Sequence, residues 1–580
     1  MEKSHKRRSE KLNAIIRITT LIAIIFVINF LGQMLYTRFD LTKEKRYTIS
    51  DASKKLLRNN KENIYIKVYL DGQLPSGFLR LRNSTKELLQ EFQSYSKTKI
   101  QIEYINPLEK AKSDQEKKAI YKELVEKGLV PTNLKLKTDE SYTEKIIFPA
   151  ALVNVGEISI PVQLLENQIG YGAEEALNNS VILLEFKFAS AIKKLTQIGT
   201  PKITFLQSYG TLLPAYVSDF KRSLEAAKYK VESIDITGKH LTKEGDSVSN
   251  WIDEFTDVLV IAKPQEKFSE KDKFRIDQFI LKGGKVLWLI DVLTAEMDMI
   301  RNDSKMFMAQ SKDLNLEDML FKYGVRINKN LVQDAQMNNP IPIIDQTNMQ
   351  PMLFPWLFFP LLTPSNQHAI GKNLDPIASY FASSMDTIQN NIKKTIILTT
   401  SDYSKALPEP VRVHLAAIKD KPDYQYFKQH HIAIGVLLEG KFTSLYKNRL
   451  DYAFMQNLTA NNLKVLEEGI ETKMIVISDG DLIKNDVSKE GAVYPLGYNQ
   501  FTNQTMSNKD YLMNCIEYLI DDNGLMETRN KEIKLRLLDK VKLKQEQGKW
   551  QLINIIIPLL MVIVFALYFN YRRKKKFTSN

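Results

Sequence analysis

The middle of the chain alternates between segments of strand periodicity and segments of helix periodicity. Residues 63–70 (NIYIKVYL) and 100–105 (IQIEYI) carry apolar side chains at every second position, and residues 79–95 between them carry apolar side chains at helical spacing. This order predicts a β-α-β unit. The other elements of a first α/β domain, with expected bounds 37–200, are a helix over 115–127, a strand-rich stretch over 145–164 and a helix over 174–195.

The pattern restarts near residue 200 with more strongly apolar strands. Residues 257–262 (DVLVIA) and 285–291 (KVLWLID) show little polar alternation, which is typical of strands covered on both faces. The sequence therefore predicts a second α/β domain over 201–525 with a mostly parallel, doubly wound sheet. Its other expected elements are strands over 202–206, 230–236, 395–398, 432–438 and 473–477, and helices over 215–228 and 270–281.

Each end of the chain carries an apolar segment without a charge, over residues 18–36 and 552–569. Both are close to the ~20 residues that an α-helix needs to cross the hydrocarbon layer of a membrane. The alternatives are a signal peptide for the first segment and a buried helix for the second. No small-residue cleavage site precedes Arg38, and a basic tail follows the second segment at once, so we expect two membrane-spanning helices.

The charges beside these segments set the expected topology. The tails, residues 1–17 and 570–580, carry six and five Lys or Arg residues, and by the positive-inside rule both tails lie in the cytoplasm. Cations also follow the first segment and precede the second, but long domains cross membranes with little regard to charge. We therefore expect a two-pass protein of the inner membrane. Its main region is periplasmic and is joined to the second span by a juxtamembrane helix over 526–551.

Composition and charge exclude some classes of protein. With 44% hydrophobic and 26% charged residues, the chain of 580 residues has the composition of a folded protein. The formal net charge is +13, and the tails, with eleven cations and two anions, leave only +4 for the rest of the chain. This balance excludes the basic surface that is typical of nucleic-acid-binding proteins. The single cysteine, Cys515, cannot form an intramolecular disulfide.

Residues 435–444 (GVLLEGKFTS) come within one residue of a phosphate loop, in which a Lys-Ser or Lys-Thr pair opens a helix. Phe442 stands where the hydroxyl would bind Mg²⁺, and the residues after Lys441 lack helical periodicity and predict a hairpin. The six histidines show no metal-ligand spacing, and the sequence contains no nucleophile elbow. We therefore expect no enzyme activity, no cofactor and no metal.

One group of polar residues is a candidate ligand site. Doubly wound sheets bind ligands in a crevice beyond the carboxyl ends of their strands. The candidate residues that follow predicted strands are Ser208, Tyr209, Asp291, Asp479 and Asp481. A small molecule or a glycan would be the ligand of such a crevice. The alternative is that these residues only cap helices and form turns.

Amides and aromatic side chains are candidate contacts with a partner. The amides inside the apolar end segments are Asn29, Gln33 and Asn554. Each costs free energy in lipid unless a neighbouring helix, from the other span or from a partner, supplies a hydrogen bond. Residues 352–362 (MLFPWLFFPLL) add an apolar stretch that its prolines keep from forming a regular helix, with Trp356, Phe358 and Phe359 as candidate contacts. Burial of this stretch in the core is the alternative.

Several short motifs resemble those of one family. They are RFDLT at 38–42, RYTIS at 46–50, YLDG at 69–72, LP at 74–75, YINP at 104–107, DQF at 277–279, GGK at 283–285 and GKF at 440–442. Together they closely resemble GldG, the family of gliding-motility-associated ABC transporter accessory proteins of Bacteroidetes. The resemblance implies a membrane-anchored periplasmic α/β protein that works with a polytopic ABC permease subunit and a separate cytoplasmic ATPase.

Two functions from different classes fit these observations. The first is a non-catalytic accessory subunit of an ABC transporter complex involved in gliding motility or an associated secretion system. The alternative is a membrane-tethered carbohydrate or cell-surface binding module that acts without a transporter. The first function requires permease and ATPase genes beside the gene for this chain.

Overall fold

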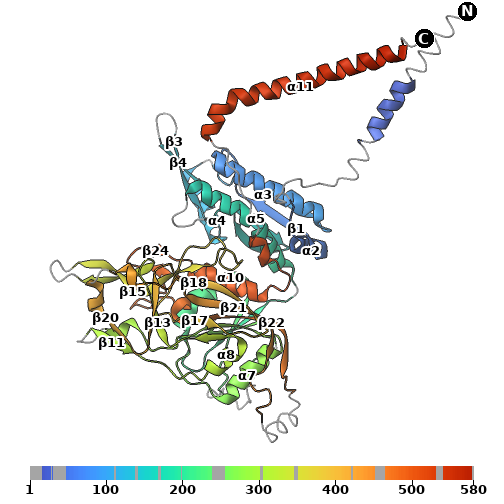
Figure 1. Ribbon diagram of the computed structural model, residues 1–580. Coiled ribbons are helices and arrows are strands. Elements are labelled where there is room, and N and C mark those ends of the chain that lie inside the picture. The colour runs from blue at the N-terminus through green and yellow to red at the C-terminus, as the bar shows by residue number, and fades with distance from the viewer. Residues whose placement is uncertain are drawn as a thin grey trace, which may run out of the picture. The chain divides into compact units, whose positions relative to one another are not determined.

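The computed structural model (Figure 1) describes residues 16–27, 29, 48–109, 111, 113–137, 142–166, 172–197, 199–237, 252, 255–300, 305–344, 350–419, 422–450, 464–530 and 540–577. The chain divides into two compact units, Met1–Lys531 and Glu532–Asn580. The first unit contains two main β-sheets. The described part of the second unit is one long helix.

The smaller sheet has the strand order β2-β1-β5-β6. Strands β1 and β2 run parallel, with Ile64 opposite Ile100, and α3 connects them, which confirms the predicted β-α-β unit. Helices α3 and α5 bury Phe92 and Phe188 against one face of the sheet, and Leu124 of α4 joins a small core on the other. The elements are α2 (Asp51–Asn59), β1 (Ile64–Val68), α3 (Ser76–Tyr95), β2 (Ile100–Tyr104), α4 (Asp114–Glu126), β3 (Thr132–Lys137), β4 (Tyr142–Ile147), β5 (Ala150–Val155), β6 (Ile158–Gln163) and α5 (Ala173–Thr196).

The larger sheet has the order β14-β15-β18-β21-β22-β10-β9-β7-β8, with β16 paired to β15. Its elements are β7 (Lys202–Leu206), α6 (Ser218–Ala226), β8 (Lys230–Ile234), β9 (Val258–Ala262), α7 (Glu270–Leu281), β10 (Lys285–Leu289), α8 (Glu317–Tyr323), β14 (Asn338–Ile344), β15 (Pro351–Pro364), β16 (Ile377–Ala378), β18 (Lys393–Thr399), β21 (Ala433–Thr443), β22 (Glu468–Ile477) and α10 (Asn508–Ile520). Short two-stranded sheets flank it: β11 (Met306–Ala309) with β20 (Val411–His414), β12 (Val325–Ile327) with β17 (Met385–Thr387), β13 (Asn330–Asp334) with β19 (Ser404–Pro408), and β23 (Tyr498–Asn499) with β24 (Gln504–Thr505).

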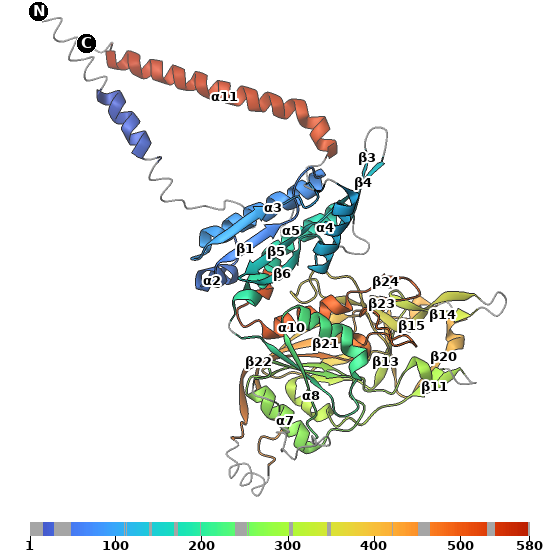
Figure 2. The same cartoon turned by 180° about the vertical axis from the view of Figure 1, so that it is seen from behind.

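Both faces of the central strands are buried, as their apolar sequences predict. In β10, Trp288 joins one core and Leu287 joins another on the opposite face. Helices α7 and α8 pack on the first face and α10 on the second, and Figures 1 and 2 show them on opposite sides of the sheet. Helix α7 has the predicted bounds because its ends are defined locally. Ser269 accepts a hydrogen bond from the backbone N–H of Asp272 at the start, and Gly283 adopts a φ of +97° after the end.

The sheet is mixed, so the prediction of a mostly parallel sheet describes only part of it. In one half of the sheet every pairing is parallel. This half contains, in spatial order, β8, β7, β9, β10 and β22. From β22 to β14 every pairing is antiparallel. Parallel pairs need a long crossover connection, whereas antiparallel neighbours do not. Consecutive strands β14 and β15 pair across a short connection, and consecutive strands β21 and β22 pair antiparallel although 24 residues separate them.

The proline-rich stretch expected to lack helical structure forms strand β15, next to the edge strand β14. Strands near an edge tolerate proline because some of their N–H groups have no ladder partner. The side chains of Trp356, Phe358 and Phe359 are buried in the core on the first face, where Phe359 packs edge-on against Phe381. The alternative of burial therefore holds for these three candidate contacts, whereas Met352 and Leu353 earlier in the strand are exposed.

The near-match to a phosphate loop lies within β21. Residues Gly435 to Lys441 are continuous strand that pairs with β18 and β22, and the described residues that come next, 442–450, are strand and turn rather than helix. Phe442 is buried and packs edge-on against Tyr323. The backbone N–H groups that would surround a phosphate are therefore in a sheet, as the predicted hairpin implies.

We expect that the full-length protein in detergent does not bind ATP and that Lys441→Ala leaves this result unchanged. The reason is that an extended strand cannot direct successive N–H groups at one phosphate. Equilibrium binding of labelled ATP with Mg²⁺ measures it. Saturable binding that Lys441→Ala abolishes would show that this interpretation of β21 is wrong.

The second unit contains α11 (Lys540–Phe577), which includes the predicted span 552–569. Its segment Gln545–Lys575 is long and apolar enough to cross a membrane, and none of its most apolar window is buried. Near the other end of the chain, the described residues Ile16–Val27 form a shorter apolar helix. The rest of the first predicted span, apart from Asn29, lies outside the described residues.

Candidate functional site

Three of the predicted crevice residues meet at the carboxyl ends of β10 and β22. Asp291 follows β10, and Asp479 and Asp481 follow β22. Asp291 and Asp481 contact Lys263, which follows β9, the strand beside β10. The Lys263 ammonium lies 2.6 Å from Asp481 Oδ2 and 3.4 Å from Asp291 Oδ2. We call these four residues the Lys263 cluster.

The backbone around the cluster is built to hold it. Lys263 has a φ of +52°, which few residues other than glycine adopt. Gly480 passes so close that a Cβ there would lie 2.7 Å from the Lys263 Cβ. The N–H of Gly480 donates to Asp291 Oδ1 at 2.5 Å, and Asp479 accepts from the N–H groups of Tyr380 and Asp481, each at 2.8 Å. The carboxylates therefore tie three strand ends and the loop of Tyr380 together.

Burial controls the ionisation of the cluster. All four side chains are buried. Burial raises the pKa of Asp291 against the lowering effect of the Lys263 charge, and burial together with the neighbouring Asp291 and Asp481 raises the pKa of Asp479 well above its usual range. Burial alone would lower the pKa of Lys263, but the carboxylates of Asp291 and Asp481 outweigh it and raise that pKa.

This chemistry favours a structural role for the cluster. A lysine that acts as a nucleophile or base needs a lowered pKa, so the strongly held ammonium of Lys263 is unsuited to either task. The same ammonium fills the space between Asp291 and Asp481 where a cation could otherwise sit. Among the residues that the structure describes, no group of three or more His, Cys, Asp or Glu side chains is arranged to hold a metal ion.

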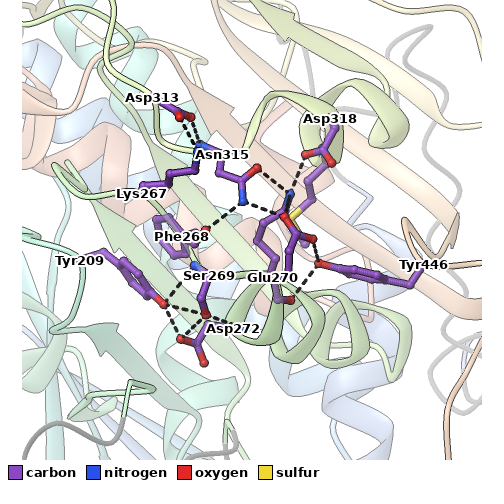
Figure 3. Close-up of polar contacts among 12 residues, drawn as sticks. Tyr209, Lys267, Phe268, Ser269, Glu270, Asp272, Asp313, Asn315, Asp318 and Tyr446 are labelled. Carbon is purple, nitrogen blue, oxygen red and sulfur yellow. Dashed lines mark hydrogen bonds and ion pairs between the residues drawn. The ribbon is translucent and has the colours of Figure 1, made fainter. Parts of the chain in front are cut away.

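Tyr209, another predicted crevice residue, contacts helix α7 rather than the acids of the cluster. Figure 3 shows its hydroxyl at the start of α7, where it contacts Ser269 and Asp272, and its ring stacks on Phe268 with centroids 4.0 Å apart. Its backbone oxygen accepts from the N–H groups of Gln265 and Glu266 at 2.8 and 3.0 Å. The turn after β7 therefore packs onto the turn after β9, at the point where the strand order reverses.

Ser208 lies in the same turn and is buried, and its hydroxyl has no hydrogen-bond partner within the described part of the chain. The five predicted residues therefore do not form one open crevice. Asp291, Asp479 and Asp481 meet in a closed ion cluster, and Tyr209 closes the adjacent switch point. Lys263 was visible in the sequence as a cation directly after an apolar strand, on the same sheet edge as the acids.

A pocket of about 630 Å³ lies at the smaller sheet, a site that the sequence interpretation missed. It is bordered by residues after the parallel strands β1 and β2, Asp71 and Asn106, and by Lys118 and Tyr121 of α4. Gly72 has a φ of +96°, and a Cβ there would lie 2.8 Å from Asn106 Nδ2. The carboxyl-end rule that was applied to the larger sheet would have found these residues.

The amides expected to contact a partner are placed only in part. Asn554 is exposed on α11, and Asn29 is exposed in the described helical part of the first apolar segment. Gln33 lies outside the described residues. The two units are described separately, so whether the apolar segments contact each other stays open as a prediction.

The chain resembles several known proteins. One relative is an uncharacterized protein of Borreliella burgdorferi, 21% identical over 98% of this chain and 99% of the relative. Among solved structures, the mmIFT52 N-terminal domain is 10% identical with a TM-score of 0.30, covering 55% of this chain and 96% of that one. A ThuA-like protein from Parabacteroides merdae is 9% identical with a TM-score of 0.26, covering 59% of this chain and 94% of that one. Scores this low add nothing to the account of the fold.

Two family models match the chain. Residues 43–154, which include most of the smaller sheet, match a domain of unknown function, DUF7088. Residues 200–515, which include the larger sheet, match the model described as ABC-type uncharacterized transport system. The second match covers more than half of the chain, so the protein belongs to this family of auxiliary components of ABC transport systems.

Proposed function

We propose that this protein is a non-catalytic, membrane-anchored accessory subunit of an ABC transporter complex. The observation that carries the proposal is the family match over residues 200–515, which contains the larger sheet and the Lys263 cluster. The chemistry of that cluster agrees with a binding or scaffolding role, because its only lysine is held as an ammonium.

Helix α11 supports the anchoring part of the proposal. Its charge-free stretch, residues 550–571, has 22 residues and spans about 33 Å at 1.5 Å per residue, which matches the ~30 Å of a bilayer core. Its large apolar side chains are exposed, and such a surface is stable only against lipid or another protein. In this proposal the N-terminal apolar segment is the other membrane span, and both basic tails lie in the cytoplasm. The sheets then lie in the periplasm of an inner-membrane protein.

The partners in this proposal are a polytopic permease subunit and, through it, a cytoplasmic ATPase. Pro558 removes one backbone hydrogen bond inside α11, and Asn554 one turn earlier carries a polar side chain at membrane depth. A neighbouring helix can satisfy both groups. The resemblance of the motifs to GldG supports a role of the complex in gliding motility or an associated secretion system.

We expect the full-length protein, purified in a mild detergent from its native cells, to bring a polytopic permease and an ATPase with it. In a variant whose residues 552–569 are replaced by polyleucine of the same length, this co-purification falls by at least about tenfold, because Asn554 and the shape around Pro558 are lost. Mass spectrometry of the eluates gives the ratio of partner to chain.

The outcomes separate the parts of the proposal. Undiminished co-purification of the polyleucine variant would show that α11 is only a tether and that docking occurs elsewhere. Absence of any transporter subunit from the wild-type eluate, with carbohydrate retained, would contradict the accessory role and favour the cell-surface binding module.

A further inference from the structure

A second pocket, of about 430 Å³, is bordered by elements of both sheets of the first unit. Helix α5 and strand β6 supply Lys187 and Gln163, and helix α10 supplies Asp510 and Asn514. Arg529, in the short 3-10 helix η6 (Met526–Asn530), completes the lining. The volume is within the range of small-molecule sites.

Arg529 is a buried cation that lacks an acidic partner. The residue is 7% exposed. Its Nη1 donates to Asn514 Oδ1 at 3.3 Å, its Nη2 donates to the Lys372 backbone oxygen at 3.1 Å, and its Nε has no acceptor among the described residues. The guanidinium also lies over the ring of Phe186, 5.0 Å from its centroid. No carboxylate within the described part of the chain lies within ion-pair distance of it.

The carboxylates closest in the pocket lining are paired with other cations. Glu166 lies 2.5 Å from Lys187 Nζ, and Glu517 lies 2.5 Å from Lys194 Nζ. Their charges, with that of Asp510, act on Arg529 from a distance, but burial outweighs them and lowers its pKa. A buried guanidinium in this state is destabilised until an anion accepts its free N–H groups.

We propose that this pocket binds a small molecule through one carboxylate group, which Arg529 holds with its Nε and Nη donors. The fork of a guanidinium matches the two oxygens of a carboxylate. The ionisable side chains of the lining balance, with Lys187, Lys194 and Arg529 opposite Glu166, Glu517 and Asp510. Because the lining is neutral in sum, a bound carboxylate leaves the site with one net negative charge and a phosphate dianion leaves it with two, so the site favours the carboxylate.

The test uses the full-length protein in mild detergent and four probes: acetate, L-glutamate, D-glucuronate and inorganic phosphate, each compared with sodium chloride at equal ionic strength. We expect the carboxylates to raise the unfolding temperature in a saturable way. Arg529→Met keeps the aliphatic packing on Phe186 and should weaken this effect by about 10- to 100-fold, the range expected for lost hydrogen bonds to a charged group. Arg412→Gln, a change at an exposed arginine of β20, should leave the effect unchanged.

The unfolding temperature of each variant without a probe shows whether the variant folds, so a loss of binding can be distinguished from a loss of folding. Arg529→Met should unfold at the same temperature as the wild type or higher, because a buried charge without a counter-ion is removed. Should Arg529→Met fold poorly, Arg529→Lys keeps the charge, loses the fork and should weaken carboxylate binding. The proposal is wrong if no carboxylate acts on the wild type, if phosphate alone acts, or if the arginine variants respond like the wild type.

Discussion

Lys263→Met is expected to destabilise the larger sheet by about 3–5 kcal/mol, the cost of leaving buried charges without their partner. The substitution keeps most of the side-chain volume but removes the ammonium that lies 2.6 Å from Asp481 and 3.4 Å from Asp291. Urea unfolding followed by tryptophan fluorescence measures the loss, since two of the four tryptophans, Trp288 of β10 and Trp356 of β15, are buried at the larger sheet.

The matched control is Lys484→Met. Lys484 also lies near Asp481, at 3.5 Å, but its side chain is 33% exposed, so water screens the pair and we expect a cost below about 1 kcal/mol. An equal, small loss in both variants would contradict the role assigned to Lys263. Asp291→Asn in the Lys263→Met background should recover part of the stability, since one of the two unpaired charges is removed.

The stability of the Lys263→Met variant should change with pH in a definite direction. The pKa values of Asp291 and Asp479 are already raised by burial in the wild type, and loss of the Lys263 charge raises that of Asp291 further. The folded variant then binds protons that the unfolded chain does not bind near neutral pH. Its stability should therefore increase as the pH falls from 8 towards 5. A loss of stability over that range would contradict this assignment.

Asp277→Ala is expected to cost about 3–5 kcal/mol, because it leaves several buried donors without an acceptor. Asp277 is fully buried in α7. It accepts from the Tyr323 hydroxyl at 2.7 Å, from the Ser444 hydroxyl at 2.7 Å and from the Leu445 N–H at 2.9 Å. One carboxylate therefore joins α7 to the end of α8 and to the segment after β21. Urea unfolding again measures the change.

Asp386→Ala is the control for Asp277. Asp386 on β17 lies 2.5 Å from Arg326, but both side chains are largely exposed, so the expected cost is about 0–1 kcal/mol. Similar midpoints for the two variants would show that the Asp277 contacts contribute little. The large difference we expect also gives a physical reason for the DQF motif at 277–279, which the sequence presented only as a family resemblance.

Elements with local signals could be predicted from the sequence, and elements that depend on distant contacts could not. Helix α7 was predicted to the residue because the Ser269 cap and Gly283 lie beside it in the chain. Strand β15 was missed as a strand because Pro355 and Pro360 oppose the usual pattern, and its conformation depends on pairing with β14, β16 and β18, which are distant in the sequence or not evident from it. The antiparallel half of the sheet likewise depends on pairings that the strand sequences alone do not specify.

The candidate site shows the same limit. The meeting of Asp291, Asp479 and Asp481 followed from their positions after strands, since carboxyl ends of parallel strands share one edge. The closure of the site did not follow, because it depends on the Tyr209 ring stacking on Phe268 and on Lys263 filling the space between the acids. Arg529 gave no signal either. In the sequence it is one cation near the juxtamembrane segment, and only the fold buries it with its Nε unpaired and with no carboxylate at ion-pair distance among the described residues.

The accessory role is tested most directly by photo-crosslinking from α11 in intact cells. A photoreactive amino acid at position 554 should crosslink to a polytopic ABC permease, because Asn554 is the polar group for which we propose a neighbouring helix. Position 563, nine residues further and on the opposite face of the helix, is the matched control and should give much less of the same product. Equal yields at both positions, or no crosslink from position 554 to any transporter subunit, would contradict the account.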